Sequence, residues 1–243
     1  MKRLFCLLLL AGLPALADIQ VAGLYGTGIG PSGLITAGSV DPYYTLTSYA
    51  TGTTFTHAAG SVVVENNLPG AWVPDTAATE WIGPATDAGA GEPPQPSSQA
   101  CGAACDYVYQ TTFTVTGDTP GIITGAIWTS DNGSLVTLGV NGGSQTQLTE
   151  TPGGLGVDNH VYGQVYNFQI PLSVNGTYAL DFDVQNWGDG SGFPSSNPTG
   201  LYVGFVGGGT PISTSVPEPG TLLLMALMGS AAFGTTKLLR KRP

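Results

Sequence analysis

The sequence predicts an all-β protein whose antiparallel strands close into two packed sheets. Short runs of alternating apolar and polar residues recur between clusters of turn-forming residues. No amphipathic helix of convincing length interrupts these runs. Charged residues make up only 9% of the chain, and Gly, Thr and Ser are abundant. This composition suits a β-rich secreted domain better than a disordered acidic chain.

The expected strands follow from the period-two alternation. In one run, Tyr107, Tyr109 and Phe113 share a face while Gln110 and Thr112 share the other, as in a strand with one side in a core. Residues 131–133 (Asp-Asn-Gly) and 141–143 (Asn-Gly-Gly) predict hairpin turns, because Asn and Gly tolerate positive φ. Eight or nine such strands close most economically into two sheets. The clearest strands are expected at residues 43–49, 61–65, 107–115, 122–129, 135–141, 161–170, 176–185 and 200–206.

The N-terminus has the features of a secretory signal peptide. Lys2 and Arg3 precede an apolar run at residues 4–13, which is too short to span a membrane stably. Ala15 and Ala17 supply the small residues that signal peptidase requires. We expect cleavage after Ala17, so residues 1–17 form the signal peptide.

The C-terminus repeats this arrangement in reverse. Pro217, Glu218 and Pro219 precede a mostly apolar segment, and basic residues close the chain. The segment predicts a single helix in the inner membrane with a cytoplasmic basic stop. Its uninterrupted apolar part, residues 221–236, is short for a full span, but Lys237 can extend its stem along the membrane and bring its charge to the surface.

This order of elements resembles the PEP-CTERM sorting signal of exported proteins in Gram-negative bacteria. The resemblance covers residues 216–243 and implies recognition by an exosortase-type sorting enzyme, with cleavage near Pro217, Glu218 and Pro219. These three would be recognition residues rather than catalytic ones. A permanent membrane anchor is the alternative, since it shares every feature except the processing. We therefore expect transient anchoring in the inner membrane and then a place at the cell surface or in the extracellular matrix.

Charge separates the two ends from the middle of the chain. All six Lys and Arg residues lie in the two targeting segments, and of the sixteen Asp and Glu residues only Glu218 lies in the sorting segment, which leaves fifteen acidic residues. Such a domain is repelled by phosphate backbones, so nucleic acid is excluded as a partner, whereas divalent cations are not. The expected organisation is a signal peptide at 1–17, a β-sandwich at 18–207, a linker at 208–215 and a sorting segment at 216–243.

Cys101 and Cys105 are the two cysteines of the mature segment. In an oxidising compartment we expect them to form a disulfide, which closes a short loop and adds little stability. A zinc site is the alternative, but two thiolates without a nearby histidine or further cysteine make a poor one.

Several segments in order resemble a jelly-roll sandwich of the galactose-binding-like type, a domain common in PEP-CTERM proteins. The resemblance implies sugar binding through loops at one end of the sandwich and a structural calcium ion. Sugar sites of that fold often use an arginine, and this domain contains none. The matching segments are residues 28–38, 41–46, 79–82, 107–113, 128–133, 140–142, 178–182 and 197–201.

Two aspartates on one predicted strand face, Asp181 and Asp183, are candidate ligands or catalytic groups. Their separation of about 7 Å suits a cation or a general acid–base pair. The simpler interpretation is that they form the solvent-facing side of a strand. Asp189, in the Gly-rich loop 188–192, adds a carboxylate and accessible carbonyls of the kind that calcium accepts, without EF-hand spacing.

Tryptophans in loops are candidate platforms for sugar rings. Trp187 stands beside the Gly-rich loop and Trp72 is close to Pro74, so both are possible glycan-binding residues. Trp81 and Trp128 have strand-like surroundings and are expected in the core.

Two classes of function compete. The first is a non-catalytic surface or matrix protein that contacts extracellular polysaccharide and holds calcium with loop carboxylates. The second is a glycan hydrolase acting through paired carboxylates. The first is favoured, because the sequence has no Gly-x-Ser-x-Gly or His-Glu-x-x-His motif and the domain is not expected to form a helix-lined cleft. We therefore assign no catalytic residue.

Overall fold

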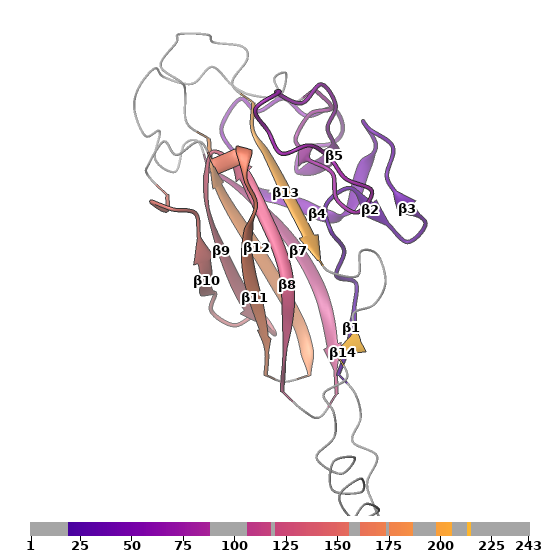
Figure 1. The fold of residues 1–243 in the computed structure, drawn as a ribbon, viewed down its shortest axis with the longest axis vertical. Helices are drawn as coiled ribbons and strands as arrows, with labels where there is room; N and C mark the ends of the chain where they lie inside the picture. The colour runs from indigo at the N-terminus through magenta and orange to yellow at the C-terminus, as the bar shows by residue number, and fades with distance from the viewer. Residues whose placement is uncertain are drawn as a thin grey trace, which may run out of the picture.

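The computed structural model describes residues 19–87, 106–117, 120–155, 161–173, 175–186, 198–205 and 213–214 (Figure 1). In these ranges the chain forms β-strands and one 3-10 turn, and no helix there is long and apolar enough to cross a membrane. The strands are β1 (Ile19–Ala22), β2 (Ile29–Gly30), β3 (Gly33–Leu34), β4 (Val40–Ser48), β5 (Ser61–Val64), β6 (Ile82–Gly83), β7 (Asp106–Thr116), β8 (Gly121–Asp131), β9 (Gly133–Val140), β10 (Thr146–Glu150), β11 (Tyr166–Leu172), β12 (Gly176–Gln185), β13 (Gly200–Phe205) and β14 (Ser213–Thr214).

Two long neighbouring strands, β7 and β12, lie at the centre of one layer. They pair antiparallel without interruption, from Gly176 opposite Val115 to Gln185 opposite Asp106. The residues predicted to face the core are buried on both strands, since Tyr107, Tyr109, Tyr178, Leu180, Phe182 and Val184 are each 0% exposed. Period-two alternation therefore fixes which face of these strands points inward.

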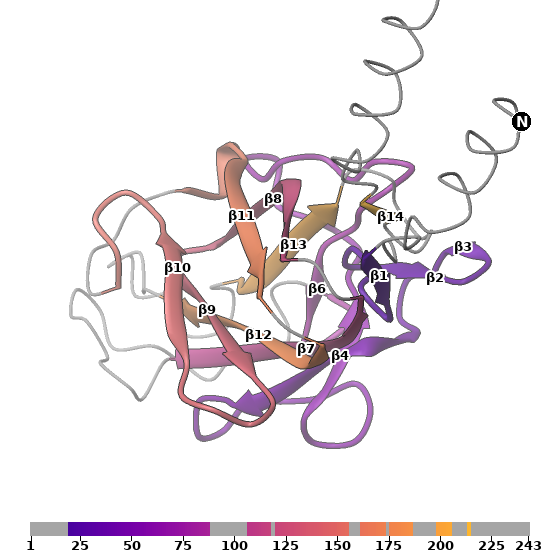
Figure 2. The same cartoon turned by 90° about the horizontal axis from the view of Figure 1, so that it is seen from below.

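The remaining strands complete two layers around this pair. The strand order is β10-β9-β12-β7-β4-β5-β6-β13-β8-β11, and every pairing between these strands is antiparallel. Figure 2 shows β9, β12, β7 and β4 on one side and β11, β8 and β13 on the other. The short strands β5 and β6 connect the layers along one edge. The predicted antiparallel β-sandwich is confirmed, and the architecture is compatible with a jelly roll. The predicted C-terminal membrane helix lies outside the described residues.

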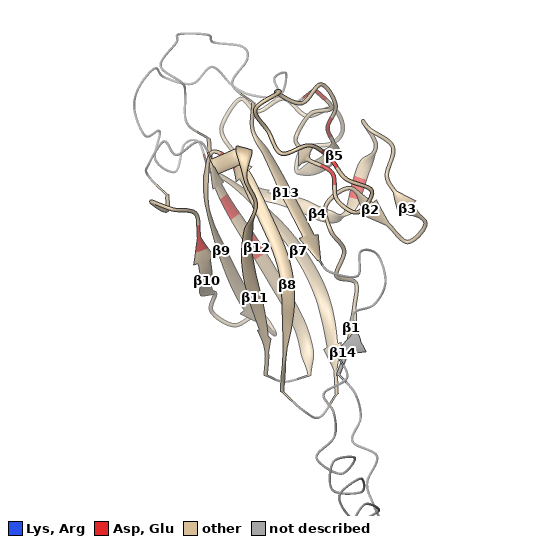
Figure 3. Ribbon diagram, in the orientation of Figure 1, with Lys and Arg blue, Asp and Glu red and all other residues tan. Residues whose placement is uncertain are grey.

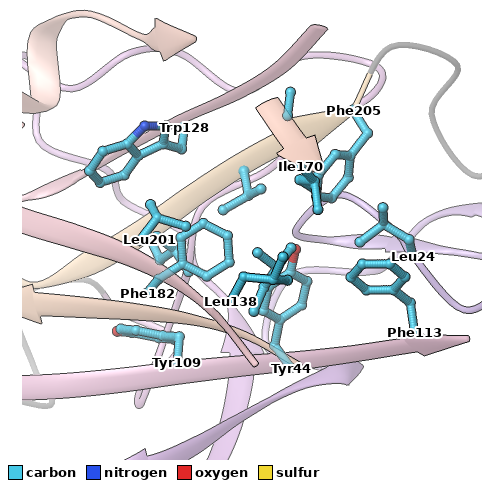
Figure 4. Close-up of a cluster of buried hydrophobic side chains, with 14 of the residues drawn as sticks. Leu24, Tyr44, Tyr109, Phe113, Trp128, Leu138, Ile170, Phe182, Leu201 and Phe205 are labelled. Carbon is cyan, nitrogen blue, oxygen red and sulfur yellow. The ribbon is translucent and has the colours of Figure 1, made fainter. Parts of the chain in front are cut away.

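Aromatic and branched apolar side chains fill the space between the layers (Figure 4). Phe168 meets Phe182 edge to face at 6.1 Å between ring centroids, and Phe113 stacks on Tyr178 at 5.2 Å. Trp128 is fully buried, as predicted. Each buried side chain of this size contributes about 1.5–3 kcal/mol to folding. The core thus holds the two layers together.

The two predicted hairpin turns have different outcomes. Asn141 and Gly142 have φ values of 52° and 71° and connect the paired strands β9 and β10, which confirms that turn. The turn predicted at residues 131–133 is wrong as a hairpin, because β8 pairs with β11 and β13 whereas β9 pairs with β10 and β12. Asp131 and Asn132 are each 4% exposed and form an interior corner between the layers. The Asp131 carboxylate accepts a hydrogen bond from Trp72 Nε1 there, so this segment makes interior contacts instead of forming an exposed turn.

The strand predicted at residues 161–170 begins later than expected. Residues Val161–Gly163 form the 3-10 turn, and β11 starts at Tyr166. Val161 is buried, and its carbonyl accepts a 2.9 Å hydrogen bond from Thr129 Oγ1. This contact fixes the turn against β8 before the strand begins.

The first and last described strands lie side by side. Gln20 of β1 pairs with Ser213 of β14 and, on the other side, with Thr116 of β7. Figure 1 places β1 and β14 together at one end of the sandwich. Residues 213–214 fall within the segment predicted as a linker, and in the structure they extend the sheet.

Candidate functional site

The outer face of the sheet carries a row of polar residues that crosses six adjacent strands. Thr137 of β9 lies opposite Asp181 of β12, Asp181 opposite Gln110 of β7, and Gln110 opposite Thr45 of β4. None of the members is buried. We call the following set the polar row: Gln147, Thr137, Asp181, Gln110, Thr45 and Ser61, in the order β10, β9, β12, β7, β4 and β5.

Asp181 organises the middle of the polar row. Its Oδ1 accepts a hydrogen bond from Gln110 Nε2 at 2.8 Å, and its Oδ2 accepts one from Gln145 Nε2 at 2.8 Å. The Gln145 side chain reaches Asp181 across Gly139, where a β-carbon would come within 3.0 Å of Gln145 Nε2. The carboxylate therefore fixes two amide groups on the surface of the sheet.

Asp183, the next outward residue of β12, lies between two further carboxyls. Burial raises the pKa of Asp183 to about 6, and the charges of Asp106 and Asp181 add to this effect. Asp183 Oδ1 is buried without a hydrogen-bond partner, whereas Asp106 accepts a 2.9 Å hydrogen bond from Gln185 Nε2. Burial also raises the pKa of Asp106. This part of the face holds negative charge at a cost, and protonation of Asp183 lowers that cost.

The shared face predicted for Asp181 and Asp183 is confirmed by the burial of their neighbours Leu180, Phe182 and Val184. Both oxygens of Asp181 already accept amide hydrogen bonds. Within the described ranges, no set of three or more His, Cys, Asp or Glu side chains is arranged to hold a metal ion. Calcium binding by Asp181, Asp183 and Asp189 remains a prediction, and Asp189 lies outside the described residues.

A second group of carboxyls surrounds the loop at Gly28. Asp41 is 1% exposed, and its two oxygens accept 2.9 Å hydrogen bonds from the backbone N–H groups of Gly28 and Tyr43. Burial raises the pKa of Asp41 to about 6, although these hydrogen bonds oppose the shift. Burial, reinforced by the charges of Asp75 and Asp41, raises the pKa of Glu80 to about 7. Both carboxyls therefore bind a proton more tightly than a solvent-exposed carboxyl does.

Trp72 lies in the interior, with 6% of its surface exposed. Its ring packs against Trp81 with centroids 4.0 Å apart, and its Nε1 donates a 2.9 Å hydrogen bond to Asp131 Oδ2. A platform for a sugar ring needs an exposed aromatic face. Trp72 therefore does not offer the exposed ring that its predicted role as a glycan-binding residue requires, and Trp81 is buried as predicted.

Several predicted residues lie outside the described ranges: Trp187, Cys101, Cys105, and the sorting residues Pro217, Glu218 and Pro219. The structure also reveals residues that sequence reasoning did not single out, chiefly Thr45, Ser61 and Gln145. Alternation placed Gln110 and Asp181 on outward faces, which is a signal for the polar row. The contact between these faces depends on strand order, which one sequence does not contain.

A comparison with protein families finds a match in the last part of the chain. Residues 215–242 match the model of the PEP-CTERM protein-sorting motif, a range that includes Pro217, Glu218 and Pro219. No curated protein and no solved structure matches the chain. The chain is therefore an exported protein that an exosortase sorts, with transient anchoring at the membrane before sorting.

Proposed function

We propose that the sandwich is a non-catalytic component of the cell surface or extracellular matrix that binds an uncharged polysaccharide along the polar row. The observation that carries this proposal is that amide, hydroxyl and carboxylate residues lie directly opposite one another from strand to strand across six strands. Adjacent strands lie about 4.8 Å apart, so the row is about 24 Å long. It thus offers an extended surface for a polymer rather than a point of contact.

The chemistry of the row suits sugar hydroxyls. Gln and Thr side chains both donate and accept hydrogen bonds, as a hydroxyl does. Asp181 holds the amides of Gln110 and Gln145 in place at 2.8 Å each. Side chains that are already ordered lose less conformational entropy when a ligand binds. The arrangement therefore supports recognition by hydrogen bonds at a modest cost.

Charge limits the kind of polymer. The described residues include no Lys or Arg, and acidic residues lie on several strands and loops of the sandwich (Figure 3). An anionic polysaccharide would be repelled by this surface. The proposal is therefore restricted to polymers without negative charge.

A glycan array probed with the exported protein, with and without calcium, tests the proposal. We expect binding to neutral glucans or mannans, and a loss of about tenfold in affinity for Gln110→Ala. Thr114→Ala is the matched control, because Thr114 is exposed on the same strand and lies outside the row. Absence of binding to every neutral glycan in both conditions would contradict the proposal and leave a purely structural role.

The second candidate function is a glycan hydrolase. The raised pKa of Asp183 beside two further carboxyls favours it. A carboxyl with a pKa of about 6 beside Asp106 and Asp181 has the protonation behaviour of a general acid next to a second carboxylate. Measurement of new reducing ends during incubation with neutral glucans distinguishes the two functions. Release that is abolished in Asp183→Asn would establish hydrolysis, whereas binding without release supports the non-catalytic role.

A further inference from the structure

The pairing of β4 with β5 contains an irregularity that opens a hollow at one end of the polar row. Val40 pairs with Val63 and Thr45 pairs with Ser61, so five steps along β4 face only two along β5. The three extra residues leave the ladder as an extended bulge. The result is an open hollow of about 420 Å³, which is within the size range of small-ligand sites.

Asp41 maintains the shape of this hollow. It lies in the bulge, lines the hollow, and is 1% exposed. Its Oδ1 accepts a hydrogen bond from Tyr43 N within the bulge, and its Oδ2 accepts one from Gly28 N in a separate loop. Both oxygens are thus engaged in holding backbone. Asp41 is a positioning residue rather than a ligand contact.

The accessible part of the hollow combines apolar and hydroxyl groups. Val40 is 40% exposed and Pro42 is also exposed, and together they offer an apolar wall. Thr45 and Ser61 line the hollow as well and supply hydroxyls. One sugar ring has this same combination, with an apolar face of C–H groups and a rim of hydroxyls. The chemistry of the lining therefore fits a single uncharged ring.

The hollow and the polar row are continuous, because Thr45 and Ser61 belong to both. On its other side β5 pairs with β6 through Val63 and Val64. Ser61 has no partner in β6 among these pairs, so the polar row ends at Ser61 in the described sheet. The turn at residues 58–61, closed by a 2.9 Å hydrogen bond from Ser61 N to the carbonyl of Ala58, contributes Ala59 and Gly60 to the lining. The row thus runs into a bordered hollow at its β5 end.

We infer that the hollow is an end-binding subsite, which holds the terminal sugar of an uncharged polysaccharide whose following residues lie along the polar row. This inference rests on the proposed function and adds direction to it. The chain lies across the strands from β10 toward β5, and one of its two ends determines the affinity. A polymer end that carries a bulky substituent does not fit.

Hexamers of β-1,4-linked and β-1,3-linked glucose, with both ends free or with a bulky tag on the reducing or the non-reducing end, test this inference. Binding of the exported protein is measured by titration calorimetry. We expect one of the two tagged forms of the bound hexamer to lose about tenfold in affinity and the other to keep it. Equal affinity for all three forms would overturn end binding and leave the proposed function intact. Failure of both free hexamers to bind would also overturn end binding, and only the absence of binding to every neutral glycan on the array would overturn the proposed function as well.

Variants that fill the hollow provide the second test. Ser61→Tyr places a ring in the hollow and should weaken the free hexamer to the affinity of the excluded tagged form. Ser48→Tyr adds the same ring at an exposed position of β4 that does not line the hollow, and should leave affinity unchanged. If Ser61→Tyr fails to fold, Ala59→Trp fills the hollow from the exposed turn instead. Unchanged affinity in a folded hollow-filling variant would contradict the inference.

Discussion

Gln110 and Asp181 lie directly opposite each other on β7 and β12, and the Gln110 amide donates a 2.8 Å hydrogen bond to the Asp181 carboxylate. We expect a double-mutant cycle of Gln110→Ala and Asp181→Ala to give a coupling energy of about 0.5–1 kcal/mol in urea unfolding. The value is modest because both side chains are partly exposed. Gln110→Ala combined with Gln147→Ala, two residues that are not neighbours in the row, should be additive. Additivity of the first pair would contradict the organising role of Asp181.

Raised carboxyl pKa values predict that stability falls as pH rises. The pKa is about 6 for Asp41, about 7 for Glu80 and about 6 for Asp183. An acid whose pKa rises on folding holds its proton more tightly in the folded state, so the free energy of unfolding decreases between pH values of about 4 and about 7. The midpoint of urea unfolding should therefore be higher at pH 5 than at pH 7.5.

Charge-neutral variants separate this effect from general repulsion among acidic residues. Glu80→Gln should flatten the pH dependence and raise stability above pH 7. Glu150→Gln removes the same charge from an exposed position and should leave the slope close to that of the wild type. A midpoint that rises with pH would show that the cited carboxyls are stabilised, rather than destabilised, as anions.

Gly83 is predicted to be irreplaceable for a steric reason. A β-carbon at this position would overlap Oε1 of Glu65, a side chain that is itself 3% exposed, and would come within 3.2 Å of the Thr199 carbonyl. We expect Gly83→Ala to lower the free energy of unfolding by about 2 kcal/mol. Gly70→Ala is the control, because nothing lies within 4 Å of a β-carbon there. Equal stability of the two variants would contradict this packing.

Trp72 should matter for folding. Trp72→Phe removes the donor to Asp131 and part of the packing against Trp81, so we expect a loss of about 2 kcal/mol in urea unfolding. The near-ultraviolet circular dichroism of this variant should also differ from that of the wild type, since the indole rings of Trp72 and Trp81 lie 4.0 Å apart. Tyr49→Phe, at a residue 41% exposed, should remain within about 0.5 kcal/mol of the wild type. A neutral Trp72→Phe would refute the interior role of this residue.

The fold was predictable where one strand carries its own pattern. The bounds of β12 agree with the prediction at both ends, because Tyr178, Leu180, Phe182 and Val184 mark the buried face without help from other segments. The strand β10, with the sequence TQLTE, has no such alternation and was not predicted. Local pattern thus identifies strands that face a core and misses polar strands at an edge.

The candidate site was less predictable because it depends on contacts between distant segments. Trp72 is close to Pro74, which suggested an exposed loop, but Asp131 and Trp81 draw the ring inside. Alternation places Gln110 and Asp181 on outward faces, but their position in one row with Thr45 follows only from the order of β4, β7 and β12. Strand order and register are properties of the whole sandwich.

The pairing of β1 with β14 has a consequence for how a bound polymer would approach the protein. The described strands nearest in sequence to the export and sorting segments lie at the same end of the sandwich, where Gln20 pairs with both Ser213 and Thr116. Gln110 lies six residues before Thr116 on β7, so the polar row is about 20 Å from that end. While the sorting segment holds the protein at the bilayer, a polysaccharide bound along the row would lie across the strands, about 20 Å from the end of the sandwich where β1 and β14 pair.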